Sequence, residues 1–240
     1  CGITKEELVK TFLPELERLA KRRGISLQEV IDLMERQYDG YHFHPEGVGM
    51  FNPFSVLNAF DAEEMGYYWF QTGTPTYLVD LLKQSDIRLL IDGVEVLASA
   101  FSEYRAETNN PLPMIYQSGY LTIKGYDDDV KLYTLGFPND EVRYGFLNFL
   151  VPFYTKVTDD ETGFHIAKFM RELKSGDVEA FMERLKIFFS GIPYELSDDT
   201  ERHYQVIFHV VFTLLGQFIR SEVRSSRGRA DAVVHTPTAI

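Results

Sequence analysis

Three carboxylates near the C-terminal end of the sequence could together hold a divalent metal ion. Glu201 is expected early in a long helix, Glu222 in a short strand after that helix, and Asp231 at the start of a second strand. Carboxylate oxygens are ligands that Mg²⁺ prefers, and a bound Mg²⁺ activates water for attack on a phosphodiester. The alternative is that they are ordinary surface acids in a chain with 36 Asp and Glu residues. Spacing alone leaves both interpretations open.

Arginines surround these carboxylates and make this stretch the one locally basic segment of the sequence. A nucleic-acid backbone needs such a patch, because cations that neutralise phosphates supply most of the non-specific affinity. The alternative is a solvated turn whose charges serve solubility. We predict nucleic-acid contacts from Arg224, Arg227 and Arg229, with Arg220 close by in the sequence.

A second candidate is the aromatic loop 38–43, in which Asp39 and His42, with His44 just beyond, could bind a metal or a ligand. These three residues have no spacing that is diagnostic of a metal site. The favoured interpretation is structural: aromatic rings attach the loop to the core, and Gly40 allows a left-handed turn. The sequence has no glycine-rich phosphate loop, so ATP is not expected to bind this chain alone.

The first third of the chain, which must support these groups, is predicted to be helical. Two capping boxes, in which Ser or Thr is followed three residues later by Glu, mark helix starts. The first helix should run without a break until Gly24, where a left-handed residue ends it. The two boxes are Thr4 with Glu7 and Ser26 with Glu29, and a further start lies at Asn52-Pro53.

The middle of the chain changes character. Two β-prone runs at 120–123 and 130–135, separated by an acidic turn with Asp at 127–129, predict a hairpin. Asn139 is then expected to cap another helix. Helix, hairpin and helix in this order would suit a winged-helix-like module, although many α+β domains share it. A long helix at about 199–218 and two short strands are expected near the C-terminus.

Composition restricts the class of protein. The 240 residues are 45% hydrophobic and 25% charged, as in a globular protein that buries a core. A net charge of −12 argues against a broad nucleic-acid-binding surface. One cysteine, Cys1, and the lack of an apolar run of bilayer length favour a cytoplasmic protein without a membrane partner. Because the chain starts with Cys rather than Met, we expect a fragment of a longer protein.

Several segments are similar to those of a large bacterial family of uncharacterised proteins. In that family an AAA-ATPase-like domain precedes a nuclease-like domain of the PD-(D/E)XK superfamily, and the resemblance covers nearly the whole chain. It is carried by YDGYHF at 38–43, FNPFSVL at 51–57, Tyr68-Trp69 with Thr72-Gly73, QSGYLTI at 117–123, GFPNDEVR at 136–143, Glu201, Ser221-Glu222 and Gly228-Arg229-Ala230-Asp231.

The resemblance implies an α+β chain with two domains. Residues 1–191 would be the C-terminal part of the AAA-ATPase-like domain, and residues 192–240 the truncated start of a PD-(D/E)XK-like α/β fold. It also implies Asp231 and Glu201 as catalytic metal ligands, Glu222 as a less certain third ligand, and Mg²⁺ as the cofactor of the complete domain. The family's Glu-x-Lys strand and Walker A segment are both missing, so we expect this chain to be inactive by itself.

Two functions of different classes stay open at this stage. The parent protein could be an ATPase-linked, metal-dependent nuclease that acts on nucleic-acid phosphodiesters. It could instead be a non-enzymatic regulatory or protein-interaction module, which the 14 Tyr and 19 Phe residues would suit, since aromatic side chains anchor interfaces. A third interpretation, nucleic-acid binding by the hairpin, is opposed by its acidic tip.

Overall fold

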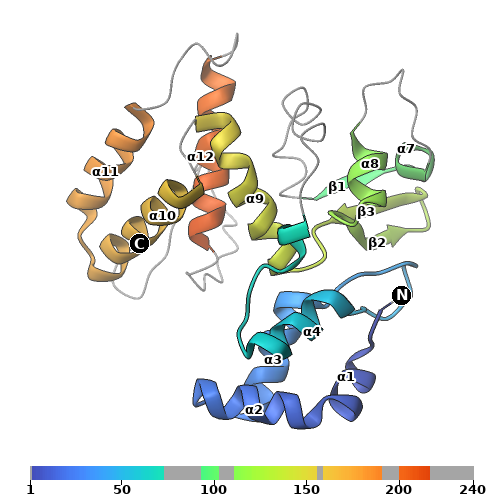
Figure 1. The fold of residues 1–240 in the computed structure, drawn as a ribbon. Coiled ribbons are helices and arrows are strands. Elements are labelled where there is room, and N and C mark those ends of the chain that lie inside the picture. The colour runs from blue at the N-terminus through green and yellow to red at the C-terminus, as the bar shows by residue number, and fades with distance from the viewer. Residues whose placement is uncertain (1, 73–92, 103–110, 156–158, 191–199, 217–240) are drawn as a thin grey trace. The chain divides into compact units, whose positions relative to one another are not determined.

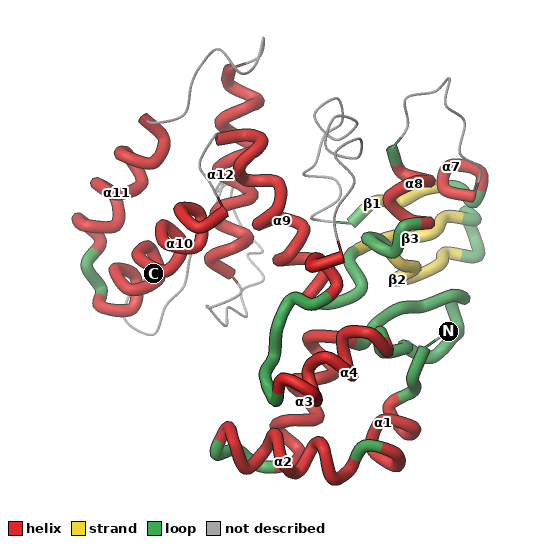
Figure 2. Tube along the Cα trace, viewed as in Figure 1, coloured by secondary structure: helices red, strands yellow, loops and turns green. Residues whose placement is uncertain are grey.

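The computed structural model describes residues 2–72, 93–102, 111–155, 159–190 and 200–216 (Figure 1). The chain forms two compact units, Cys1–Phe146 and Leu147–Ile240. The described elements are mainly helices, with one small antiparallel sheet in the first unit (Figure 2). The α+β class expected from the sequence is therefore confirmed at this level.

The first unit starts with four helices whose ends follow local sequence signals: α1 (Lys5–Thr11), α2 (Leu13–Arg23), α3 (Leu27–Tyr38) and α4 (Pro53–Ala62). Both capping boxes are present, with the hydroxyls of Thr4 and Ser26 each accepting from the backbone N–H of a Glu at 3.2 Å. Gly24 ends α2 with φ of 67°. The side chain of Asn52 accepts from Phe54 N at 3.0 Å and starts α4.

The helix expected to run unbroken from Thr4 to Gly24 is in fact two helices. The break falls at Phe12, whose φ of −114° and ψ of 24° leave the helical region. Pro14 explains it, because proline lacks an N–H and its ring clashes with the carbonyl group four residues earlier in a continuous helix. In the first turn of α2, the missing N–H and the ring of Pro14 do not destabilise the helix.

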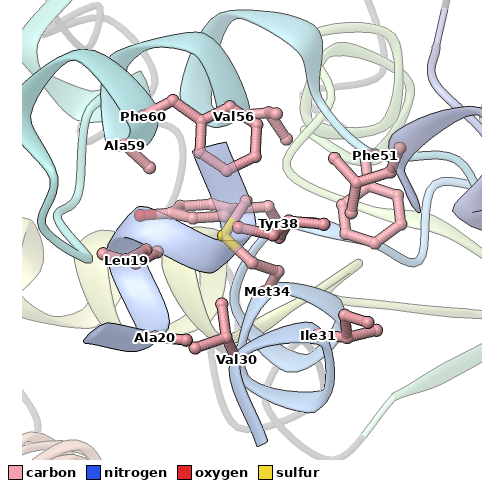
Figure 3. Packing of buried hydrophobic residues seen from close by; sticks show 12 residues of the cluster. Leu19, Ala20, Val30, Ile31, Met34, Tyr38, Phe51, Val56, Ala59 and Phe60 are labelled. Atoms are coloured by element: carbon pink, nitrogen blue, oxygen red, sulfur yellow. The ribbon is translucent and has the colours of Figure 1, made fainter. Parts of the chain in front are cut away.

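These four helices enclose a hydrophobic core in which Tyr38 is central (Figure 3). The Tyr38 side chain is fully buried, and its hydroxyl donates to Gly66 O at 3.1 Å and accepts from Gly66 N at 2.9 Å. Both hydrogen-bonding directions of the phenol are satisfied, so its burial carries no polar penalty. The buried members are Leu8, Leu16, Leu19, Ala20, Val30, Ile31, Met34, Tyr38, Phe51, Val56, Ala59 and Phe60.

A three-stranded antiparallel sheet completes the first unit. The predicted hairpin is confirmed as β2 (Thr122–Asp127) and β3 (Leu132–Gly136), with a bulge between Ile123 and Gly125. A strand that the sequence did not indicate, β1 (Val94–Val96), pairs with the other edge of β3, giving the order β1-β3-β2. Two short helices, α7 (Ser99–Ser102) and α8 (Leu112–Gln117), lie between β1 and β2 in the sequence.

Aromatic side chains fill the space beside the sheet. The ring of Trp69, in the 3₁₀ helix η1 (Trp69–Thr72), meets the ring of Tyr120 edge-on, with centroids 4.7 Å apart. Tyr120 in turn packs on Phe146 at 5.0 Å, and Phe146 on Phe137 at 5.5 Å. These contacts join the ring of Trp69 to the buried rings of Tyr120 and Phe146.

The second unit consists of helices where it is described. α9 (Asp140–Thr155) starts in the first unit and continues into the second, followed by α10 (Asp159–Ser175), α11 (Val178–Ser190) and α12 (Thr200–Gly216). Asn139 caps α9 as predicted, since its Oδ1 accepts from Val142 N at 3.0 Å. Phe169 packs against Phe181 and Phe188, with ring centroids 5.4 and 6.0 Å apart.

Two further expectations concern the domain boundary and membrane-spanning helices. The boundary predicted near residue 192 lies outside them and stays a prediction. Among the helices that are described, none combines the length and the apolar character needed to cross a membrane.

Candidate functional site

Most of the residues predicted to form a nuclease-like site lie outside the described part of the chain. Glu201 belongs to the first turn of α12, as the sequence suggested, but its side chain is not described. The predicted metal site therefore stays a prediction. The others that lie outside are Glu222, Asp231, Arg220, Arg224, Arg227 and Arg229.

The histidines of the aromatic loop are engaged with nearby backbone. His42 Nδ1 lies 3.0 Å from Gly40 O, and His44 Nδ1 accepts from Glu46 N at 3.2 Å. Gly40 has a φ of 99°, so it supplies the left-handed turn that was predicted. Within the described ranges, no cluster of three or more His, Cys, Asp or Glu side chains could hold a metal ion. Tyr38 is buried and Gly40 makes the turn, as the structural interpretation of the loop expects, whereas Phe43 is 67% exposed.

The same loop is fixed against the start of α9. A side chain at Gly40 would collide with the carbonyl oxygen of Pro138, so the close approach requires glycine. Asn139 Nδ2 donates to Asp39 O at 2.9 Å, and Lys124 Nζ donates to Pro138 O at 2.8 Å. Three segments, from α3, β2 and the β3–α9 connection, are thereby held in one place.

A charged cavity of about 450 Å³ opens where these segments meet. This volume lies in the range typical of small-molecule sites, about 300–1,000 Å³. Its lining also includes Leu135 and Phe137, whose side chains are buried in the core. Its ionisable lining residues are three acids and three bases: Glu35, Asp39, Asp140, Arg36, Lys124 and Arg143.

Two of these ionisable groups each have a buried polar atom without a hydrogen-bond partner in the described residues. They are the acceptor Oδ1 of Asp39 and the donor Nε of Arg143. Burial raises the pKa of the Asp39 carboxyl, and desolvation lowers the pKa of the Lys124 ammonium. Buried polar atoms usually find partners, because leaving one unsatisfied costs about 1–3 kcal/mol. Two residues that line the cavity therefore have unmet hydrogen-bonding capacity, one as an acceptor and one as a donor.

Glu141 follows the lining residue Asp140 in the sequence but does not line the cavity itself. Its carboxyl group is fully buried. Ser55 Oγ donates to its Oε2 at 2.7 Å, and the backbone N–H of Trp69 donates to its Oε1 at 3.1 Å. Burial raises the Glu141 pKa to about 7, and these hydrogen bonds partly oppose the rise. One carboxyl group thus joins α4, η1 and the first turn of α9.

Sequence reasoning missed Lys124, Arg143 and Glu141. Lys124 is one cation in a β-prone run, and Arg143 and Glu141 resemble the charged surface residues of any helix start. Their partners lie far away in the sequence: Glu141 is 86 residues from Ser55. The one local signal was the family resemblance of two segments, 38–43 and 136–143. These two segments pack together in the structure.

Comparison with known proteins gives one informative match. No family model matches the chain, and no solved structure does. The chain is 30% identical over 253 aligned residues to an uncharacterised protein in the vnfD 5′ region of Azotobacter chroococcum mcd 1. That alignment covers 98% of this chain and 44% of the relative, so the chain spans less than half of that protein's length.

Proposed function

We propose that the first unit is a non-enzymatic, regulatory binding module of a longer protein, and that it binds a small polar ligand in the charged cavity. The observation that carries this proposal is the pair of buried, unsatisfied atoms, Asp39 Oδ1 and Arg143 Nε, at one cavity of ligand size. A ligand that supplies both partners would add hydrogen bonds that the described residues do not make.

The groups around the cavity are preorganised, which supports binding. Asp39 is fixed through its backbone carbonyl by Asn139, and Lys124 through its bond to Pro138. Arg143 projects from the second turn of a helix of 16 residues. Side chains already held in place lose little conformational entropy when a ligand arrives, so more of the contact energy is retained as affinity.

The experiment is a thermal-shift titration of the 240-residue chain with probes of four charge classes: inorganic phosphate, ethanolamine, L-glutamine and glucose. We expect at least one class to raise the unfolding temperature in a saturable way, because a ligand that binds only the folded state stabilises it. Arg143→Gln should abolish that rise, whereas Arg23→Gln, at an exposed position of α2, should keep it. Equal responses in the two variants, or no response to any class, would contradict the proposal.

The sheet region also has features of a winged-helix-like module, a finer fold than the α+β class alone. Strand order β1-β3-β2, with two short helices inserted between β1 and β2, supports this. Its hairpin tip carries Asp at 127, 128 and 129, and its single cation, Lys131, pairs with Asp128 at 2.6 Å. This acidity favours a protein partner over nucleic acid at the tip. Binding of labelled duplex DNA that Lys131→Ala abolishes would argue for the opposite.

A second candidate function, for the parent protein, is the metal-dependent nuclease linked to an ATPase-like domain. The observation that favours it is that Glu201 lies in the first turn of a long helix, α12, as the nuclease-like sequence pattern requires. In this proposal Asp231 and Glu201, with Glu222 less certain, hold Mg²⁺, which would activate the attacking water. Arg224, Arg227 and Arg229 contact the nucleic acid.

This candidate is tested on the longer protein, with the sequence that continues after Ile240. We expect Mg²⁺-dependent cleavage of plasmid DNA that Asp231→Asn abolishes and that Asp61→Asn, at an exposed position of α4, leaves intact. The 240-residue chain alone should not cleave. Cleavage by the longer protein that survives Asp231→Asn would contradict the assignment of Asp231.

A further inference from the structure

We infer that the ligand of the charged cavity is a small zwitterion, with a protonated amine and a carboxylate on neighbouring carbon atoms as in a free α-amino acid. This inference rests on the proposed binding function and adds the chemical class of the ligand. It follows from the balance of charges around the cavity, from the two unsatisfied atoms and from the cavity's size.

The charges around the cavity sum to zero before any ligand binds. Three carboxylates face three cations. Three of the six already have ionic partners: Arg36 Nε lies 3.2 Å from Asp140 Oδ2, and Glu35 Oε1 lies 2.8 Å from Lys5 Nζ outside the cavity. A ligand of large net charge would face like charges in this lining, whereas a neutral ligand with separated charges would not.

The acidic side of the cavity suits an amine. Asp39 Oδ1 lacks a donor, and Gly49 packs against the carboxyl with no side chain in between. Burial is the main cause of the raised Asp39 pKa, and a hydrogen bond from the Gly40 backbone and the charge of Lys124 lower it only in part. An ammonium group beside Asp39 would favour the ionised carboxylate and donate the missing hydrogen bond.

The basic side suits a carboxylate. Arg143 Nε lacks an acceptor, and a guanidinium group binds planar carboxylates through parallel hydrogen bonds. Lys124 Nζ uses one of its three protons on Pro138 O and keeps donors for a second acceptor. The N-terminal end of α9, at Asp140, adds the positive end of a helix dipole.

The volume and the remaining lining fit a compact molecule. A cavity of about 450 Å³ is too small for a folded partner and is large enough for one amino acid with bound water. Leu135 and Phe137 also line the cavity, and both side chains are buried in the core beneath it. Thr134 supplies a hydroxyl beside them.

The test is isothermal titration of the 240-residue chain with three matched probes: L-glutamine, N-acetyl-L-glutamine without the cationic amine, and L-glutamine amide without the carboxylate. The free amino acid should bind at least about 10-fold more tightly than either derivative, because each loses one charged hydrogen bond. The other free amino acids, tested in the same way, establish whether another side chain fits better.

Two substitutions assign the two ends of the ligand. Asp39→Asn should weaken the binding of L-glutamine about 10-fold and leave the affinity for the N-acetyl derivative unchanged. Arg143→Gln should weaken the binding of L-glutamine and leave the affinity for the amide unchanged. Asp61→Asn and Arg23→Gln, both at exposed positions, are the matched controls. Circular dichroism melting of each variant verifies that the fold is kept.

The outcomes separate this inference from the function on which it rests. Saturable, Arg143-dependent binding of inorganic phosphate or glucose, with no free amino acid bound, overturns the zwitterion and leaves the binding module in place. If neither the twenty free amino acids nor the phosphate, ethanolamine and glucose probes bind, both proposals are overturned. Equal affinity for L-glutamine and its N-acetyl derivative also overturns the zwitterion.

Discussion

Replacing Glu141 with Gln should remove much of the pH dependence of the free energy of unfolding between pH 4.5 and pH 7. Glu141 is fully buried, and burial raises its pKa from 4.5 to about 7. Glutamine has nearly the same shape and no charge. Its carbonyl oxygen can accept from Trp69 N, and its amide can donate to the hydroxyl of Ser55, which reverses that hydrogen bond.

The sign follows from the direction of the pKa change. A carboxyl group whose pKa is higher in the folded state binds its proton more tightly there, so protonation stabilises the fold. The contribution of Glu141 is complete below pH 4.5 and is lost as the pH rises to about 7. A rise of about 2.5 pKa units, at about 1.4 kcal/mol each, corresponds to about 3 kcal/mol.

The assay is urea unfolding at a series of pH values, followed by tryptophan fluorescence. Trp69 is the one tryptophan of the chain, and its own backbone N–H contacts Glu141, so the signal reports on the first unit. We expect the two proteins to be similarly stable near pH 4.5 and the Glu141→Gln variant to be more stable by about 3 kcal/mol at pH 8. Glu17→Gln, on the exposed face of α2, should follow the parent curve throughout.

Two results would refute this reasoning. One is a Glu141→Gln variant whose stability falls between pH 4.5 and 7 as steeply as that of the parent, because another group would then cause the dependence. The other is a variant markedly less stable than the parent at pH 8. That result would show that the hydrogen bonds from Ser55 and Trp69 stabilise the ionised carboxylate more than burial destabilises it.

Two further predictions concern single contacts. Gly40→Ala should lower the free energy of unfolding by about 2–4 kcal/mol in urea titrations. The new side chain would sit on a backbone with a φ of 99° and would collide with Pro138 O. A loss below about 1 kcal/mol would show that the loop can move away. Arg184→Ala should cost about 3 kcal/mol in calorimetry, since Arg184 Nε bonds the Glu172 carboxylate at 2.6 Å and Glu172 is largely buried. The exposed Arg171→Ala is its control, and an equal effect of both would contradict the prediction.

Local signals were read correctly from the sequence where a few neighbouring residues determine the structure. The capping boxes at Thr4 and Ser26 and the glycine turn at Gly24 depend on hydrogen bonds within three or four residues. The break at Phe12 is equally local, but the expectation of one unbroken helix missed it, although Pro14 indicates it. The three-residue strand β1 was not accessible in this way, because its partner β3 lies about 40 residues further along the chain.

The charged cavity depends on residues that no local pattern connects. Asp39, Lys124 and Arg143 come from the C-cap of α3, from β2 and from α9. Asp39 was a candidate ligand in the aromatic loop, but nothing in the sequence connects it with the two cations. Cavity geometry arises from the packing of these elements, and packing is specified by many weak contacts rather than by a motif. The C-terminal carboxylates show the opposite case: Asp231 was singled out by its motif, and its geometry lies outside the described residues.

In the proposed binding function, the loop 38–43 combines a structural role and a binding role in the same residues. The close approach of Gly40 to Pro138 secures the loop, and it also fixes Asp39 on the wall of the cavity. Asn139 connects the two roles, since it caps α9 with its oxygen and binds Asp39 O with its amide nitrogen. The position of Asp39 is therefore determined by the same contacts that start α9 and orient Arg143. A change that loosens the loop should weaken ligand binding as well as folding, without touching the ligand.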